Sequence, residues 1–265
     1  MNDFALTYDD VTLVPDFSDI ESRKDPNPST NIMGLELKTP IISANMDTVT
    51  ESKMAIAMWK AGGLGILHRF MDVQKNCDEF RAVKAAGCEC MVSIGAGPDW
   101  WSRAEALYNA GARHFVIDIA HGHSTLVKEV LKKMRVEFGD EVKIMAGNIA
   151  TASAVNHMKL WGADAVKVGV GGGSICTTRV VTGFGVPMFT SILECAKVAR
   201  AAGMQCVADG GIRASGDIVK ALVAGADAVM VGRLLAGVEE TPGEILVGTK
   251  EYRGMSSAST RHMIG

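Results

Sequence analysis

The chain has 265 residues and a formal net charge of −3, with 48% hydrophobic and 22% charged residues, a balance that excludes disordered and fibrous classes. Its charges are scattered rather than gathered into runs, so we expect no nucleic-acid partner, and no apolar stretch reaches the about eighteen residues that span a bilayer. The start has neither a basic region nor an apolar stretch of the signal-peptide kind. We therefore expect one cytoplasmic domain over residues 1–265, with a small-molecule partner.

One unit recurs along the chain: an amphipathic helical stretch, a glycine paired with alanine near its end, and then a short apolar run. Glycine ends a helix in the left-handed conformation at little steric cost, so each pair predicts a helix stop. The apolar run that follows is typical of a strand buried on both faces, as in a parallel sheet. In chain order, strands are expected at 41–43, 64–67, 90–94, 115–119, 143–146, 165–168, 206–208 and 228–231.

Eight strands that alternate with helices predict an α/β fold of the (β/α)8 or TIM-barrel class, with an open doubly wound sheet as the alternative. The pattern changes after the last strand. Residues 244–247, a Gly248-Thr249 turn and residues 251–253 indicate a hairpin extension at about 239–257. No long amphipathic eighth helix is visible, so the barrel is expected to lack a regular one. Either a subunit neighbour closes it, or the chain is a shortened version of a longer design.

The cysteines divide into two kinds. Five fall in apolar helical or strand segments, where burial as small hydrophobes is expected: Cys77, Cys88, Cys90, Cys195 and Cys206. Their spacing does not match a zinc site, and a chain of this size and composition does not need disulfides, so we expect reduced thiols. Cys176 follows a run of glycines and is flanked by hydroxyls and a cation. Such a loop is typical of a nucleophile.

Polar residues and glycines gather at the carboxyl ends of the expected strands, which form the catalytic face of such barrels. Glycines in the loops after strands six, seven and eight let backbone N–H groups approach a phosphate, although each one alone can simply serve a tight turn. Asp209 can accept two hydroxyl hydrogen bonds, as a ribose diol would offer. Asn148 can form hydrogen bonds with the edge of a ring or orient a ribose, or it can be a simple turn residue. Asp118 precedes His121 and His123, whose spacing disfavours a metal site.

These motifs resemble the family of inosine monophosphate dehydrogenase and guanosine monophosphate reductase, from Leu6 to about Ser257. The most specific motif is the cysteine loop, Gly173-Ser174-Ile175-Cys176-Thr177-Thr178. The others are Tyr8-Asp9-Asp10-Val11, Asn45-Met46-Asp47-Thr48, Gly147-Asn148, Ala208-Asp209-Gly210-Gly211 and Tyr252-Arg253-Gly254-Met255. The resemblance implies a homotetrameric barrel in which Cys176 attacks C2 of the purine to form a covalent adduct. Hydride then moves between C2 and a nicotinamide.

The resemblance also implies which residues form the site. The catalytic residues that it implies are Cys176 and Thr178. The nucleotide, through its phosphate, ribose and base, is expected to contact Asn148, Gly173, Ser174, Asp209, Gly211, Gly232, Arg233, Gly254, Met255 and Ser256. Arg233 stands where the dehydrogenases tend to carry serine. The nicotinamide side is expected to include Asp118, Ala120 and Asn148. A monovalent cation such as K⁺ is expected on the backbone carbonyls of Gly171, Gly173 and Cys176.

Two reactions occur in the family. The reductase removes ammonia from C2 of guanosine monophosphate (GMP) with hydride from NADPH and yields inosine monophosphate (IMP). The dehydrogenase passes hydride from IMP to NAD and then hydrolyses the adduct to xanthosine monophosphate. Segments similar to the reductases are 44–47, 68–70, 117–123, 193–196 and 254–257, and segments similar to the dehydrogenases are 215–221 and 252–254.

The dehydrogenases' regulatory insertion is absent, as in reductases, so the resemblance favours a GMP reductase. Reductases carry a glutamate directly after the Met-Ser-Ser run, and this chain has Ala258 there. The dehydrogenases' flap, with its arginine base, would lie beyond Gly265. General acid–base groups of this kind are typically worth about 10²–10⁴ in rate. IMP dehydrogenase, and a catalytically impaired barrel that binds purine nucleotides, therefore remain the alternatives.

Overall fold

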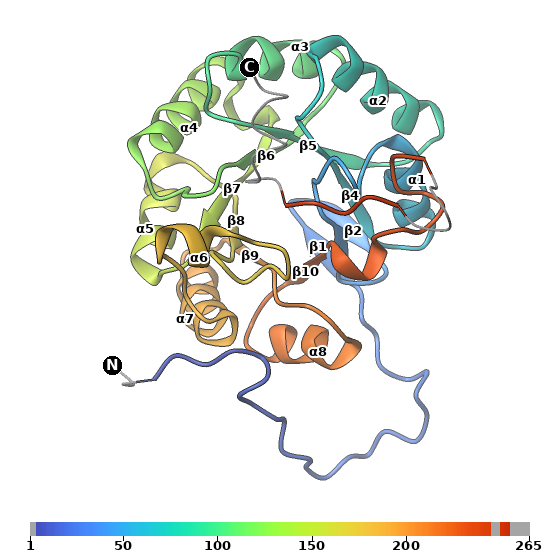
Figure 1. Ribbon diagram of the computed structural model, residues 1–265, viewed down its shortest axis with the longest axis vertical. Helices are drawn as coiled ribbons and strands as arrows, with labels where there is room; N and C mark the ends of the chain where they lie inside the picture. The colour runs from blue at the N-terminus through green and yellow to red at the C-terminus, as the bar shows by residue number, and fades with distance from the viewer. Residues whose placement is uncertain (1–3, 245–249, 255–265) are drawn as a thin grey trace.

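The strands close into a parallel barrel. The computed structural model describes residues 4–244 and 250–254 (Figure 1). The strand order around the barrel is β10-β3-β4-β5-β6-β7-β8-β9. The bounds are β3 Ile41–Ser43, β4 Leu64–Leu67, β5 Cys90–Ile94, β6 His114–Asp118, β7 Lys143–Ile149, β8 Ala165–Val168, β9 Gln205–Asp209 and β10 Ala228–Val231. The predicted (β/α)8 barrel is confirmed, and the open doubly wound sheet is wrong.

Helices between the strands cover the outside of the barrel (Figure 1). They are α1 Ser52–Lys60, α2 Val73–Ala85, α3 Trp100–Asn109, α4 Thr125–Phe138, α5 Ala152–Trp161, the short α6 Thr178–Thr182, α7 Met188–Ala201 and α8 Ser215–Val223, with 3-10 turns η1 Gly139–Glu141 and η2 Arg233–Leu235. The expected glycine stops are confirmed by positive φ at Gly62, Gly87, Gly111, Gly162, Gly203 and Gly225.

The segment after β10 contains no α-helix in residues 232–244 or 250–254. Within the described ranges, no helix is long and apolar enough to cross a membrane.

Side chains of the strands alternate between two cores. One set, which includes Ile66, Met91 and Val116, packs together with residues of the neighbouring strands in one cluster. Their chain neighbours, such as Leu67 and Val92, belong to a second cluster that includes residues of the surrounding helices. Full burial of one large apolar side chain contributes about 1.5–3 kcal/mol. Burial on both faces explains why the strands read as continuous apolar runs rather than alternating ones.

A small hairpin precedes the barrel and was not predicted. Strands β1 Thr30–Ile32 and β2 Leu35–Leu37 pair antiparallel through a two-residue turn in which Met33 (φ 52°) and Gly34 (φ 91°) both have positive φ. The Met33 N–H donates to Oε1 of Gln205, the first residue of β9, at 2.6 Å. The hairpin therefore packs at the amino-terminal end of the barrel, opposite the strand ends that face a ligand.

The end of β7 differs from the expected bounds, and the expected hairpin lies partly outside the described ranges. Strand β7 runs to Ile149, three residues beyond the predicted end, so Asn148 lies within a strand rather than after it. The register with β8 shifts between Gly147 and Ile149. Of the expected hairpin at about 239–257, residues 245–249 and 255–257 lie outside the described ranges, and Glu251–Arg253 carries no assigned strand. The hairpin stays a prediction.

Candidate functional site

A cavity of about 460 Å³ opens at the carboxyl ends of the barrel strands. Small-molecule sites commonly have volumes of about 300–1,000 Å³. Every predicted site residue that the structure describes lines this cavity: Asp118, Ala120, Asn148, Gly171, Gly173, Ser174, Cys176, Thr178, Asp209, Gly211, Gly232, Arg233 and Gly254. Met255 and Ser256 lie outside the described ranges, so their contacts with the base stay predictions.

Cys176 lies in the loop between β8 and α6 and is partly exposed, whereas the other five cysteines are buried as expected. Its Sγ is 3.3 Å from Oγ1 of Thr178, the first residue of α6. The Cys176 N–H donates to the carbonyl of Gly173 at 3.1 Å, which folds the loop into a tight turn at the cavity wall. Of the six cysteines, Cys176 is the one that lines the cavity.

The glycine-rich loops converge at one end of the cavity. Gly169 has φ of 153°, and a Cβ there would lie 1.9 Å from the carbonyl oxygen of Asp209, so only glycine lets the ends of β8 and β9 approach this closely. A Cβ at Gly232 would lie 3.0 Å from the hydroxyl of Tyr252. Tyr252 lines the cavity but was not a predicted site residue. Burial raises its pKa, against the opposing effect of a hydrogen bond with Ser174. A phosphate here would meet amides, hydroxyls and Arg233.

The cavity also contains a buried lysine that sequence analysis missed. Lys167 of β8 donates from Nζ to Oδ1 of Asp118 at 2.8 Å, to Oδ2 of Asp209 at 2.7 Å and to Oδ1 of Asn148. Asn148 in turn donates from Nδ2 to Oδ2 of Asp209 at 2.8 Å. Burial would raise the pKa of Asp118, but Lys167, with smaller effects of Arg69 and Asn45, holds it below the ordinary value. The two predicted carboxylates and the predicted amide thus belong to one network around a single ammonium.

The opposite wall is built on the end of β4, where Arg69 lines the cavity. Its guanidinium stacks on the ring of Phe70, 4.6 Å from the ring centroid. Burial lowers the pKa of Arg69, partly offset by Asp118 and Asp99. In the part of the chain that the structure describes, Nε of Arg69 is buried without a hydrogen-bond partner.

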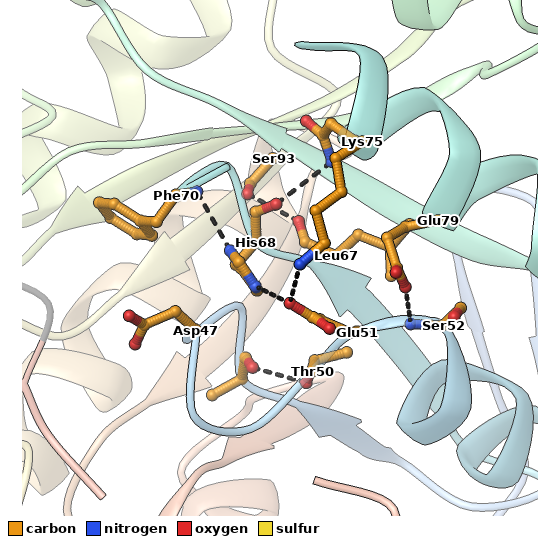
Figure 2. Close-up of polar contacts among 12 residues, drawn as sticks. Asp47, Thr50, Glu51, Ser52, Leu67, His68, Phe70, Lys75, Glu79 and Ser93 are labelled. Atoms are coloured by element: carbon orange, nitrogen blue, oxygen red, sulfur yellow. Dashed lines mark hydrogen bonds and ion pairs between the residues drawn. The ribbon is translucent and has the colours of Figure 1, made fainter. Parts of the chain in front are cut away.

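A partly buried network joins His68, the residue before Arg69, to Glu51 and Lys75 (Figure 2). Nδ1 of His68 accepts a hydrogen bond from the Phe70 N–H at 3.1 Å, so Nε2 carries the hydrogen and donates to Oε1 of Glu51, also at 3.1 Å. Lys75 of α2 reaches the same Glu51 oxygen at 3.2 Å. The hydrogen bond from His68 is the main cause that lowers the pKa of Glu51, against the opposing effect of burial. The network links the start of α1, the end of β4 and α2.

Among residues 4–244 and 250–254, no group of three His, Cys, Asp or Glu side chains is placed to hold a metal ion. Nε2 of His123 lies instead 2.6 Å from Nδ1 of His157 on α5. The carbonyl of Gly173, one of the expected K⁺ ligands, accepts the hydrogen bond from Cys176 described above. Binding of K⁺ stays a prediction.

Comparison with known proteins gives the family. The family profile described as "IMP dehydrogenase / GMP reductase domain" matches residues 5–264. An inosine-5'-monophosphate dehydrogenase of Cryptosporidium parvum is 38% identical over 298 residues, which cover 96% of this chain and 74% of the relative. A GMP reductase of Leishmania major is 33% identical over 391 residues, covering 95% and 80%. An inosine-5'-monophosphate dehydrogenase of Nitrosopumilus maritimus is 32% identical over 382 residues, covering 96% and 80%.

Relatives of similar identity thus carry both names, so identity alone does not separate the two activities. The profile covers nearly the whole chain, including both the cysteine loop and the strand ends that surround the cavity. The chain belongs to the IMP dehydrogenase / GMP reductase family of purine nucleotide oxidoreductases.

Proposed function

We propose that this protein is a GMP reductase, which converts GMP and NADPH to IMP, ammonia and NADP. The position of Cys176 supports chemistry at C2 of the purine, which both family reactions share, and the segments similar to reductases, such as 117–123, favour the reductase. The Sγ of Cys176 lies beside the Thr178 hydroxyl, at a cavity whose other walls supply glycine amides for a phosphate and a carboxylate for a ribose. A nucleotide anchored at both groups would lay its base across the cysteine loop.

In the proposed reaction, the Cys176 sulfur adds to C2 of the purine and a carbon–sulfur bond forms. The exocyclic amine then leaves as ammonia, and the covalent adduct remains on the enzyme. The Thr178 hydroxyl, 3.3 Å from the sulfur, is close enough to pass the proton of the Cys176 thiol to the amine, which then leaves as NH3. When hydride reaches C2, the carbon–sulfur bond breaks, the thiolate is released with IMP, and the thiolate regains its proton from solvent. Cys176 therefore ends each cycle unchanged.

The residues on the far side of the cavity suit a nicotinamide nucleotide. Bound NADPH supplies the hydride. Asp118 and Ala120 line that side of the cavity, and Arg69 lines the cavity as well. Asn148, which hydrogen-bonds to Lys167 and Asp209, is the residue that we expect to contact both ligands. The family resemblance also implies a homotetramer and a K⁺ ion bound at the cysteine loop, and both are part of the proposal.

IMP dehydrogenase is the second candidate, because relatives with that name match this chain as closely as the reductases do. One assay separates the two. Purified protein is given GMP with NADPH, and in a second cuvette IMP with NAD, and nicotinamide absorbance is followed in each. Oxidation of NADPH with GMP supports the reductase, and reduction of NAD with IMP supports the dehydrogenase. A change in neither, with GMP still bound, would leave a nucleotide-binding barrel without turnover.

A further inference from the structure

Lys167 is a charged side chain inside an otherwise apolar strand. It is 2% exposed, and its neighbours in β8 are Ala165, Val166 and Val168. An ammonium has three N–H donors. Here the three acceptors come from three different strands: Asp118 at the end of β6, Asn148 on β7 and Asp209 at the end of β9. All three donors are therefore used, and each bond reaches a residue that lines the cavity.

The packing of the barrel does not by itself require a lysine here. The segment 162–169 is nearly repeated at 225–232, and the residue that corresponds to Lys167 there is Met230, which is also buried. An unbranched apolar side chain therefore fits the equivalent place. The neighbouring strand β7 has a glycine beside Lys167. A Cβ on Gly147 would lie 2.7 Å from the Lys167 Cβ, so a larger residue there would collide with the lysine. The charge is thus kept at a position where methionine would satisfy the packing.

The electrostatics show what the charge does. Burial alone would lower the pKa of Lys167, but Asp118 and Asp209 outweigh burial and raise it, so the ammonium is retained. Two like charges close to each other repel, and a cation between them offsets that repulsion. The Lys167 ammonium forms ion pairs with both Asp118 and Asp209, at 2.8 and 2.7 Å, and both carboxylates line the cavity.

The hydrogen bonds to Asp209 also set its orientation. Lys167 and Asn148 both donate to Oδ2, at 2.7 and 2.8 Å. In the described part of the chain, Oδ1 of Asp209 accepts no hydrogen bond, so its lone pairs stay available to a ligand. One oxygen of the carboxylate is held by the protein, and the other is left for the hydroxyls of a ribose.

We propose that Lys167 is a positioning residue for nucleotide binding: it holds Asp209 by one oxygen so that the carboxylate recognises the ribose hydroxyls. The inference rests on the proposed function, because it takes the ligand to be a purine ribonucleotide. Lys167 is 2% exposed and all three of its N–H donors are used within the protein, so it acts through Asp209. Its removal should therefore weaken the recognition of the hydroxyls, rather than binding of the phosphate or the base.

The test compares dissociation constants for GMP and its 2′,3′-dideoxy analogue, measured by titration calorimetry. The wild type should prefer GMP by at least about tenfold, because hydrogen bonds to a charged group contribute about 1.5–3 kcal/mol. In Lys167→Met this preference should fall to within about twofold, while the analogue binds about as it does to the wild type. Lys128→Met, at an exposed position on α4, is the matched control and should keep the wild-type preference.

If Lys167→Met does not fold, as judged by circular dichroism, Lys167→Met with Asp118→Asn is measured instead. That double variant removes one positive and one negative charge, so the net charge of the cluster is unchanged. It should show the same loss of preference. A wild-type preference for GMP that survives in the folded variant overturns the inference and leaves the proposed function standing. A wild type that binds neither nucleotide overturns both.

Discussion

The guanidinium of Arg253 pairs with the carboxylate of Asp47, 206 residues earlier in the chain, with Nε 3.1 Å from Oδ2. Asp47 lies in the loop after β3, and its side chain is 5% exposed. The residues on either side of Arg253, Tyr252 and Gly254, both line the cavity. The ion pair therefore ties the last described segment of the chain to the barrel at the edge of the site.

Asp47→Ala should loosen this segment and weaken nucleotide binding. Loss of a buried, charge-assisted hydrogen bond costs about 1.5–3 kcal/mol, so we expect KM for the nucleotide to rise at least about tenfold. Glu251→Ala is the control: Glu251 contacts the same arginine at 3.0 Å, but its side chain is 66% exposed. Exposed pairs contribute little, so its KM should stay within about twofold of the wild type. Equal effects of the two substitutions would contradict this account.

Gly169→Ala should damage both the fold and the site. A Cβ there would collide with the Asp209 carbonyl, and φ of 153° is unfavourable for a side chain. We expect a loss of about 2–4 kcal/mol in the free energy of unfolding, together with weaker GMP binding. Gly203→Ala is the matched control, because Gly203 also has positive φ, at 65°, but open space around it. Urea unfolding gives both values, and a Gly169 variant as stable as the Gly203 variant would refute the close approach.

Glu51→Gln should make the Tm of the protein less dependent on pH in the acid range. Because the hydrogen bond from His68 holds the folded-state pKa of Glu51 below its ordinary value, the carboxylate stabilises the fold above that ordinary value. This stabilisation is lost as the pH falls through the folded-state pKa. At pH 7 the variant should therefore have the lower Tm, by about 2–4 °C for each kcal/mol lost.

The Tm gap between wild type and Glu51→Gln should close as the pH is lowered to about 3. Melting curves followed by circular dichroism at pH 7, 5 and 3 give the comparison. Glu105→Gln, at an exposed position on α3, is the control and should melt like the wild type at each pH. A gap that is independent of pH would show that the Glu51 charge does not stabilise the fold.

The barrel and much of the cavity could be predicted because they depend on local signals. A helix that ends at a glycine followed by an apolar run defines each helix–strand unit, and the carboxyl ends of parallel strands must share one face. The polar residues and glycines after those runs, such as Asp209 and Gly211, were therefore expected together. Cys176 was distinguished from the other cysteines by its loop alone.

Other features depend on contacts that no local pattern reports. Lys167 sits in an apolar run, and the one available signal was that its counterpart in the repeated segment is Met230. The β1–β2 hairpin was missed because its strands have three residues each and its turn places Met33, not asparagine, at positive φ. Tyr252 and Arg69 are 183 residues apart in the sequence, and only the folded chain brings both to the cavity.

The claim on which the rest depends is that the Cys176 sulfur performs the chemistry at C2 of the purine. Its most direct test is turnover of GMP with NADPH by Cys176→Ala, with the dissociation constant for GMP measured on the same preparation and Cys88→Ala, a buried thiol, as the control. The account predicts that Cys176→Ala binds GMP with near wild-type affinity and shows no turnover, while Cys88→Ala remains active. Turnover retained by Cys176→Ala would contradict it.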